Sequence, residues 1–364
     1  MFEHLRKLQG CVIALFLIIL APTLRAQQQD YYAFVRADWH LAGIAEYQSD
    51  WRGAIEYYQQ AVEHSASLPL VVREWYRGTA EYGIARCSAR IHEDSASRTH
   101  LDRAFHHHFW NSPLIRLDSL LVSACGSTWL DSESQFWATV CAEERPTWHA
   151  QPPLIYYPNG YDSTDRWPLI IAMHGGNGNY ESFAERWPEM ANLLKAVIVV
   201  PAGIIRESEI TNSWGSNMDA IEGPILKIAS DFTHAHRVDA SQVYLTGFSQ
   251  GAQASIELTL RHPDIFHGAI AMSGFTSDPP NDSALAVARA RGVRIYAISG
   301  EYEDPTFHAQ IQGIHDLCAK GGIPFDLTIV PGMIHEVPLD LRTKFLAGWN
   351  WVRPPAQAAV HRGE

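Results

Sequence analysis

Ser249 stands between glycines in the five-residue stretch Gly-Phe-Ser-Gln-Gly. The apolar run 243–246 before it is typical of a buried strand, and residues 252–260 after it are typical of a helix. A serine at such a tight turn is held above the sheet at a helix N-terminus, and the glycines let the neighbouring backbone approach. We therefore predict that Ser249 is a nucleophile. The alternative is an ordinary glycine-rich loop between a strand and a helix.

A second glycine-rich loop, His-Gly-Gly-Asn-Gly-Asn, follows the apolar run 169–173. Attack on an acyl carbon places negative charge on the carbonyl oxygen, and a glycine-lined loop can direct a backbone N–H at that oxygen. We predict that Gly175 or Gly176, together with the amide of Gln250, forms such an oxyanion hole. His174 is expected to brace this loop through hydrogen bonds.

One histidine is distinguished by its position after a strand. His335 follows the strand-like run 327–330 and the turn that contains Pro331 and Gly332. Active sites of open α/β sheets lie at the carboxyl ends of the strands, where Ser249 is also expected. We predict that His335 is the general base that takes the proton of the serine.

Two neighbouring carboxylates could orient this histidine. Glu303 and Asp304 both lie in the loop that follows the strand-like run 294–298. We favour Asp304, because the following Pro305 restricts its backbone to extended conformations, which suits a loop leaving a strand. Glu303 remains the alternative acid.

Residues from about 150 to 352 resemble the α/β-hydrolase superfamily, near its carboxylesterase/phospholipase and polyhydroxybutyrate-depolymerase-like esterase branches. The resemblance is carried by the Gly-Phe-Ser-Gln-Gly stretch, by the His-Gly-Gly loop and by the chain order serine, acid, histidine. It implies a serine carboxylic-ester hydrolase that works through an acyl-enzyme intermediate, without a metal or organic cofactor. One departure is that Glu303 occupies the commonest position of the acid, one residue before Asp304.

The resemblance leaves the substrate open. The same residues could serve a serine peptidase of the same fold, or the hydrolase domain could be inactive within a helical-repeat interaction protein. For an esterase, the substrate is a small-molecule or polymer ester. Trp214 is a candidate wall of the substrate pocket, and packing in the core explains it equally well.

The elements that must position these residues form an α/β domain over residues 151–352, followed by a tail, 353–364. Continuous apolar runs favour a parallel sheet that is covered by helices on both faces. The strand-like runs are 154–157, 169–173, 197–200, 243–246, 269–272, 294–298 and 327–330.

Residues 27–150 are rich in helix-forming and aromatic residues and predict a small all-α domain. One helical hairpin has the alternation of small and large residues that is typical of a tetratricopeptide repeat. Its residues are Leu41, Ala42, Ala54, Tyr58 and Ala61. Such a helical domain could bind a protein partner.

Residues 1–26 have the pattern of a cleavable signal peptide, with Arg6 and Lys7 before the apolar run 11–21. The run is shorter than the ~20 residues of a membrane-spanning helix, so we expect a secreted or periplasmic protein without stable membrane insertion after processing. An uncleaved membrane anchor is the alternative. The cysteines after this segment are Cys87, Cys125, Cys141 and Cys318. They permit disulfides in such a compartment, with Cys125–Cys141 as the favoured pair, and free buried cysteines are the alternative. The cysteines do not form paired CxxC units, so we expect no structural zinc site.

The chain has 364 residues, which favours a catalytic domain with a second module. Its formal net charge is −12, with both signs mixed along the sequence. Nucleic-acid binding calls for a concentrated basic face, so we expect no nucleic-acid partner.

Overall fold

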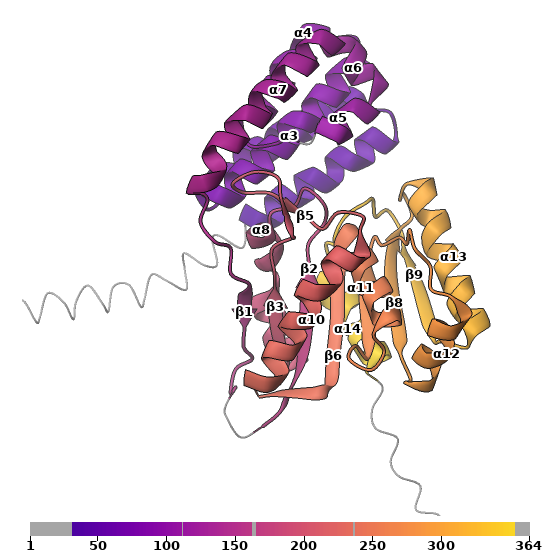
Figure 1. The fold of residues 1–364 in the computed structure, drawn as a ribbon. Helices are drawn as coiled ribbons and strands as arrows, with labels where there is room; N and C mark the ends of the chain where they lie inside the picture. Colours follow the sequence, from indigo (N-terminus) through magenta and orange to yellow (C-terminus); the bar gives the residue numbers. More distant parts are fainter. Residues whose placement is uncertain (1–30, 111, 162–164, 236, 354–364) are drawn as a thin grey trace, which may run out of the picture. The chain divides into compact units, whose positions relative to one another are not determined.

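The computed structural model describes residues 31–353 except 111, 162–164 and 236 (Figure 1). The expected signal peptide and residues 354–364 of the expected tail lie outside the described residues. Contacts divide the rest into two compact units, which we call the helical unit and the α/β unit. The helical unit comprises the described residues up to His107 with Ser123–Cys125, and the α/β unit comprises His108–Val122 and the residues from Gly126 onward.

The helical unit contains helical residues 31–47, α2 (Trp51–His64), α3 (Leu70–Arg90) and α4 (Asp94–His106). Small residues allow α2 and α3 to approach closely. A Cβ added at Gly83 would lie 2.6 Å from the ring of Tyr58, which is buried between these helices. Ala42, Ala54 and Ala61 are fully buried as expected, whereas Leu41 is 40% exposed. That the hairpin is a tetratricopeptide repeat stays a prediction.

The α/β unit begins with α5 (Ser112–Leu117), most of α6 (Ser119–Cys125) and α7 (Ser127–Glu144). A sheet of seven strands follows, in the order β1-β3-β2-β6-β7-β8-β9, and only β1 runs antiparallel to its neighbour. Its strands are β1 (Leu154–Tyr156), β2 (Trp167–Met173), β3 (Val197–Val200), β6 (Val238–Phe248), β7 (Gly268–Met272), β8 (Arg294–Gly300) and β9 (Phe325–Val330). The prediction of a largely parallel sheet is confirmed, whereas a domain boundary near residue 150 stays a prediction.

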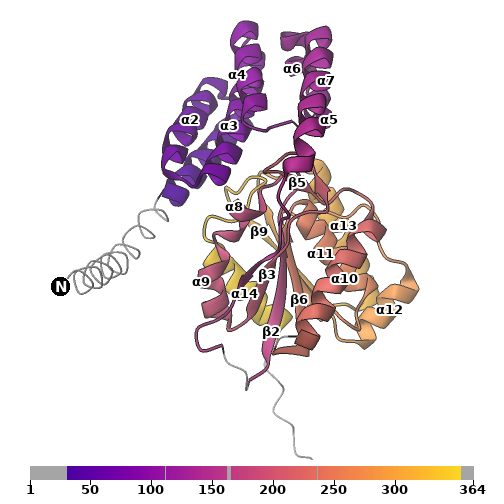
Figure 2. The ribbon, with the colours of Figure 1, turned by 60° about the vertical axis from the view of Figure 1, so that its left-hand side comes forward.

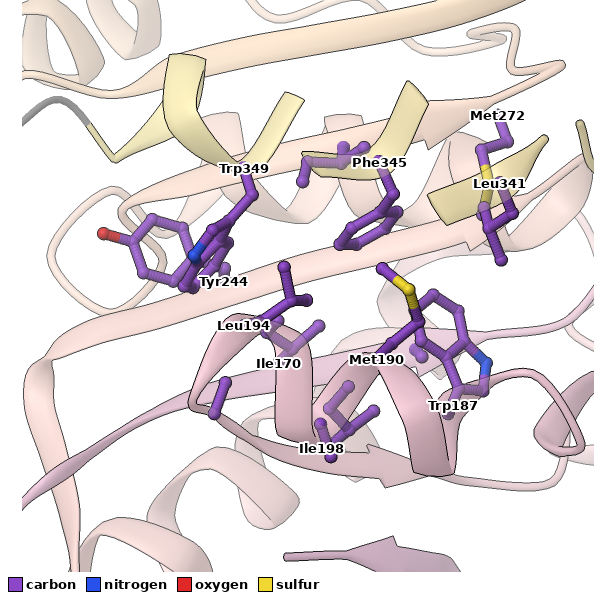
Figure 3. Close-up of a cluster of buried hydrophobic side chains, with 14 of the residues drawn as sticks. Ile170, Trp187, Met190, Leu194, Ile198, Tyr244, Met272, Leu341, Phe345 and Trp349 are labelled. Carbon is purple, nitrogen blue, oxygen red and sulfur yellow. The ribbon is translucent and has the colours of Figure 1, made fainter. Parts of the chain in front are cut away.

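Helices cover both faces of this sheet. Neighbouring residues of a strand point to opposite faces, so each face has its own cluster of buried side chains. Ile170 belongs to a buried cluster with Trp187 and Met190 of α9 (Trp187–Leu194) and with Phe345 and Trp349 of α14 (Leu341–Val352), which Figure 3 shows.

On the opposite face, Leu169 and Ile171 pack with residues of α10 (Met218–Ala235) and α11 (Gln250–Arg261). Residues of α11, α12 (Asp282–Ala290) and α13 (Pro305–Gly321) form a third cluster with β7 and β8. Figure 2 shows β2, β3 and β6 between α9 and α14 on one side and α10 and α11 on the other. Because helices cover both faces of the sheet, its central strands are apolar at consecutive positions.

The expected disulfide between Cys125 and Cys141 is wrong, since both cysteines are free and buried. The Sγ of Cys141 donates to the carbonyl of Glu207 at 3.2 Å, and the Sγ of Cys125 lies 3.7 Å from the hydroxyl of Ser97. Each thiol is thus packed in its own unit. Within the described part of the chain, every helix is too short or too polar to cross a membrane.

Candidate active site

Ser249 lies at the turn between β6 and α11, as the sequence predicts. Its backbone has φ 54° and ψ −119°, a conformation that an L-residue adopts at a cost of about 1–3 kcal/mol. The turn is held from both sides. The amide of Ser249 donates to the carbonyl of Met272 at 3.0 Å, and its carbonyl accepts the amide of Gln253 at 3.0 Å.

The two glycines that flank the motif are required by close backbone contacts. A Cβ at Gly247 would lie 2.3 Å from the carbonyl carbon of Gly251. A Cβ at Gly251 would lie 2.2 Å from the carbonyl oxygen of Met173 at the end of β2. Any larger residue would push the helix away from the sheet, and the serine with it.

His335 links the serine to a carboxylate. Its Nε2 lies 3.0 Å from the Oγ of Ser249, and its Nδ1 lies 2.8 Å from the Oε1 of Glu303. The side chain of Glu303 is 1% exposed. Burial opposes its ionisation, but the hydrogen bond and the charge of His335 outweigh burial and hold the pKa of Glu303 below its ordinary value. The carboxylate therefore accepts a hydrogen bond from the protonated Nδ1, which leaves the lone pair of Nε2 for the serine hydroxyl.

The expectation that Asp304 contacts His335 is corrected by this geometry. Asp304 is exposed and is the N-cap of α13, where its Oδ1 accepts the amide of Thr306 at 2.7 Å. Its backbone is extended, with φ −53° and ψ 129°, as Pro305 requires. An acidic residue followed by proline at the first helical position is also a helix start signal. Pro305 therefore marks Asp304 as the N-cap of α13, and the side chain of Glu303 is the one that points to His335.

Gly175 and Gly176 lie beside the serine. A Cβ at Gly176 would lie 2.6 Å from the side chain of Gln250, and a Cβ at Gly175 would lie 3.3 Å from the Cβ of Ser249. The structure thus brings the three expected oxyanion residues together around Ser249. The next amide of the loop, that of Asn177, already donates to the Oγ of Ser213 at 2.7 Å.

His174 braces this loop, as expected. Its Nε2 accepts the amide of Gly203 at 2.8 Å, so Nδ1 carries the proton and donates to the carbonyl of Gly175 at 2.7 Å. Burial lowers the pKa of His174 to about 4, although the hydrogen bond to Gly175 opposes this shift. The ring is therefore neutral at pH 7 and is already engaged through both nitrogens.

The lowered pKa of His174 predicts that the protein loses stability in mild acid. The unfolded chain takes up a proton near pH 6.5, whereas the folded chain does so only near pH 4, so the free energy of unfolding falls as the pH falls between these values. One pKa unit corresponds to ~1.4 kcal/mol, which gives a loss of about 2–3 kcal/mol between pH 7 and pH 4.5. Urea unfolding at both pH values measures it.

The control for this titration is His174→Asn, which keeps a donor for the carbonyl of Gly175 and cannot titrate. It is expected to be less stable than the wild type at pH 7, and its stability should depend less on pH by the same 2–3 kcal/mol. Equal losses in the two proteins between pH 7 and pH 4.5 would show that His174 does not titrate as a buried group.

Trp214 is not a wall of an open pocket, which corrects the expectation for this residue. It is 1% exposed and packs in the core. Its Nε1 donates to the carbonyl of His174 at 2.8 Å, and its backbone amide donates to the Oε1 of Gln250 at 3.1 Å. Trp214 therefore ties the oxyanion loop to the residue that follows the serine.

A small hairpin that the sequence did not predict supports this loop. It consists of β4 (Ile205–Arg206) and β5 (Asn212–Ser213). Asn212 exchanges two backbone hydrogen bonds of 2.9 Å with Gly178, and the side chain of Asn179 donates to the carbonyl of Ile210 at 2.7 Å. Strands of two residues carry no readable periodicity, so the pattern of apolar residues could not reveal them.

Residues 163–341 match the family model described as phospholipase/carboxylesterase. The matched stretch is just under half of the chain. With the largely parallel sheet and the serine at the turn after β6, it supports an α/β-hydrolase fold of the esterase class for this part of the chain.

Individual relatives match shorter stretches. A putative esterase, NocK, from Nocardia uniformis is 26% identical over 36% of this chain and 38% of the relative. Poly(3-hydroxyalkanoate) depolymerase C from Paucimonas lemoignei is 28% identical over 29% of this chain and 28% of the relative. The match thus covers less than half the length of each of these two relatives. A crystal structure of an uncharacterized Bacillus cereus protein aligns with a TM-score of 0.46 at 16% identity, over 83% of this chain and 94% of that protein.

Proposed function

We propose that the protein is a serine carboxylic-ester hydrolase that uses Ser249, His335 and Glu303 as its catalytic triad. The observation that carries the proposal is the imidazole of His335, which lies within hydrogen-bond distance of the serine hydroxyl and of a buried carboxylate. This arrangement lets a neutral imidazole accept the proton of the serine as the serine attacks.

In the first step, the Nε2 of His335 takes the proton of Ser249 while Oγ bonds to the carbonyl carbon of the ester. Charge develops on the carbonyl oxygen, and we expect the amides of Gly176 or Gly175 and of Gln250 to stabilise it. The bond between the carbonyl carbon and the alcohol oxygen then breaks as the imidazolium gives its proton to that oxygen, and the acyl group remains on the serine as an acyl-enzyme.

Glu303 makes this proton transfer favourable. It fixes the tautomer of His335 in which Nε2 is free, and its negative charge stabilises the imidazolium that forms. The carboxylate stays ionised because its pKa lies below the ordinary value. In the second step, His335 activates a water molecule against the acyl-enzyme and returns the proton to Ser249.

We further propose that the substrate is a small-molecule or polymer ester. Both relatives described above are named for ester hydrolysis or polymer depolymerisation, which supports this substrate class. A secreted or periplasmic location, a cleavable signal peptide over residues 1–26 and a protein-binding role for residues 27–150 are parts of the same proposal.

A fluorophosphonate probe tests the proposal, because it reacts only with a serine that a neighbouring base activates. We expect the folded wild-type protein to be labelled once, on the peptide that contains Ser249. Heat-unfolded protein should not react, which controls for unspecific labelling. Labelling on another residue, or none at all, would contradict the proposal. Parallel assays of p-nitrophenyl esters and aminoacyl-anilides then separate an esterase from a peptidase.

A further inference from the structure

Phenylalanine rings lie next to the imidazole of His335. The ring centroids of Phe248 and Phe307 lie 5.0 Å and 5.3 Å from that of His335. Phe275 stacks on Phe307, with 4.7 Å between the ring centroids and 12° between the ring planes. All three phenylalanines are partly exposed. Partly exposed apolar rings therefore lie next to the catalytic base.

The loop that carries Phe275 is anchored before the ring. The amide of Ser273 donates to the carbonyl of Ile298 at 2.7 Å, and its hydroxyl donates to the carbonyl of Glu336 at 3.1 Å. Glu336 directly follows His335 in the chain. The start of the loop is thus tied to the segment that holds the base.

The same loop is anchored after the ring by a buried carboxyl group. The Oε1 of Glu257 accepts the amide of Ser277 at 3.0 Å and the side-chain amide of Gln253 at 3.0 Å. Gln253 also donates to the hydroxyl of Ser277 at 2.6 Å. Glu257 is 1% exposed, so its end of these bonds is buried, whereas Ser277 is exposed. Anchoring at both ends fixes the position of Phe275 between them.

The anchored loop lies on the first turn of the helix that begins after the nucleophile. A Cβ at Gly274 would lie 3.1 Å from the Cβ of Ala252, which is three residues after Ser249. The aromatic pair therefore belongs to the surroundings of the active serine.

The two sides of the proposed reaction differ chemically. The carbonyl oxygen of the ester must face Gly175, Gly176 and Gln250, whereas the leaving oxygen must lie where the Nε2 of His335 can give it a proton. Phe248 lies on the side of the oxyanion loop, since its ring is 2.9 Å from the position of a Cβ on Gly175. Phe248 thus borders both the oxyanion loop and the imidazole. Phe307 lies beside the imidazole that protonates the leaving oxygen, and Phe275 stacks on Phe307.

We propose that Phe275 and Phe307, which we call the aromatic wall, bind the alcohol part of the ester, and that this part is an aryl-substituted, flat and apolar alcohol. The inference rests on the proposed function. Stacking of one ring on another contributes beyond the burial of area, so the wall favours a flat ring over a puckered ring of similar size.

The test compares phenylethyl butyrate with cyclohexylethyl butyrate. These esters share one acyl group, and their alcohols have similar size and similar acidity, so that the flat ring is the difference. We expect the wild-type protein to have the higher kcat/KM for the phenylethyl ester. Phe275→Leu keeps apolar volume but removes the flat ring, and it should lower the ratio of the two kcat/KM values about 3- to 10-fold, the size of one aromatic contact. Phe275→Tyr keeps the ring and should keep the ratio.

The rate at which the acyl-enzyme is hydrolysed separates the wall from two other roles. No alcohol takes part in that step, so Phe275→Leu should leave the decay of the butyryl-enzyme within about two-fold of the wild type. A residue that only positions His335 would slow this step as well, because the same base acts in it, and it would lower kcat/KM for both esters equally. A wall for the acyl group would change the decay and leave the alcohol preference unchanged. Either result would overturn the inference.

Different results would contradict the proposed function and the aromatic wall. If the wild-type protein hydrolyses neither butyrate nor any p-nitrophenyl ester, the proposed function is wrong. If it hydrolyses both butyrates with equal kcat/KM, the function stands and the aromatic wall is wrong. Thermal unfolding of Phe275→Leu and Phe275→Tyr verifies that both variants are folded.

Discussion

Ser249→Ala is expected to abolish ester hydrolysis and fluorophosphonate labelling. The substitution removes the atom that bonds to the acyl group, and loss of the nucleophile in such triads lowers turnover by on the order of 10⁴ or more. Stability should change little, by about 1 kcal/mol at most, because the hydroxyl contacts His335 at the surface of the site and alanine keeps the same backbone restriction. Initial rates on a p-nitrophenyl ester and thermal unfolding provide the two measurements.

Ser249→Gly is the matched variant that separates chemistry from strain. It lacks the same hydroxyl and should be equally inactive. Glycine adopts φ 54° and ψ −119° without the steric cost, so its unfolding free energy should exceed that of Ser249→Ala by about 1 kcal/mol after the entropic cost of glycine is included. Hydrolysis that survives in either variant would refute Ser249 as the nucleophile.

Glu303→Gln is expected to lower turnover by on the order of 10³–10⁴. The amide has no negative charge to stabilise the imidazolium, and when its NH₂ group faces His335 it selects the tautomer whose Nε2 carries a proton and cannot accept that of Ser249. The side chains have nearly equal volume, so folding should be retained. Steady-state rates on one activated ester, with circular dichroism of the same samples, measure both effects.

Asp304→Asn is the neighbouring control for this substitution. Asparagine is as good an N-cap as aspartate, so the bond from the amide of Thr306 and the start of α13 should survive. Turnover should stay within about three-fold of the wild type, since Asp304 is exposed and makes its bond to the helix. If Asp304→Asn proved inactive and Glu303→Gln active, the order of the two carboxylates in the site would be reversed.

Local sequence determined most of the framework of this site. The seven apolar runs are strands of one sheet, because a strand buried on both faces needs apolar residues at consecutive positions. The turn at Ser249 was predictable for a steric reason, since only glycine fits at Gly247 and Gly251, where backbone atoms of other elements lie within 2.3 Å of an added Cβ. His335 followed from its position after a strand. Each of these features depends on residues that are near one another in the chain.

Tertiary structure decided the features that depend on contacts between residues far apart in the chain. Glu303 and Asp304 are adjacent and equally acidic, and the packing of β8 beside β9 directs one inward to a histidine 32 residues away while the other caps α13. By its residue type, Trp214 could line a pocket or pack in the core. The hydrogen bond from its indole to the carbonyl of His174, 40 residues away, places it in the core. The thiols of Cys125 and Cys141 were an acceptable pair by count, but burial in separate units gave each a different partner. Residue types specify what a side chain can do, and contacts between segments far apart in the chain select which of those possibilities is used.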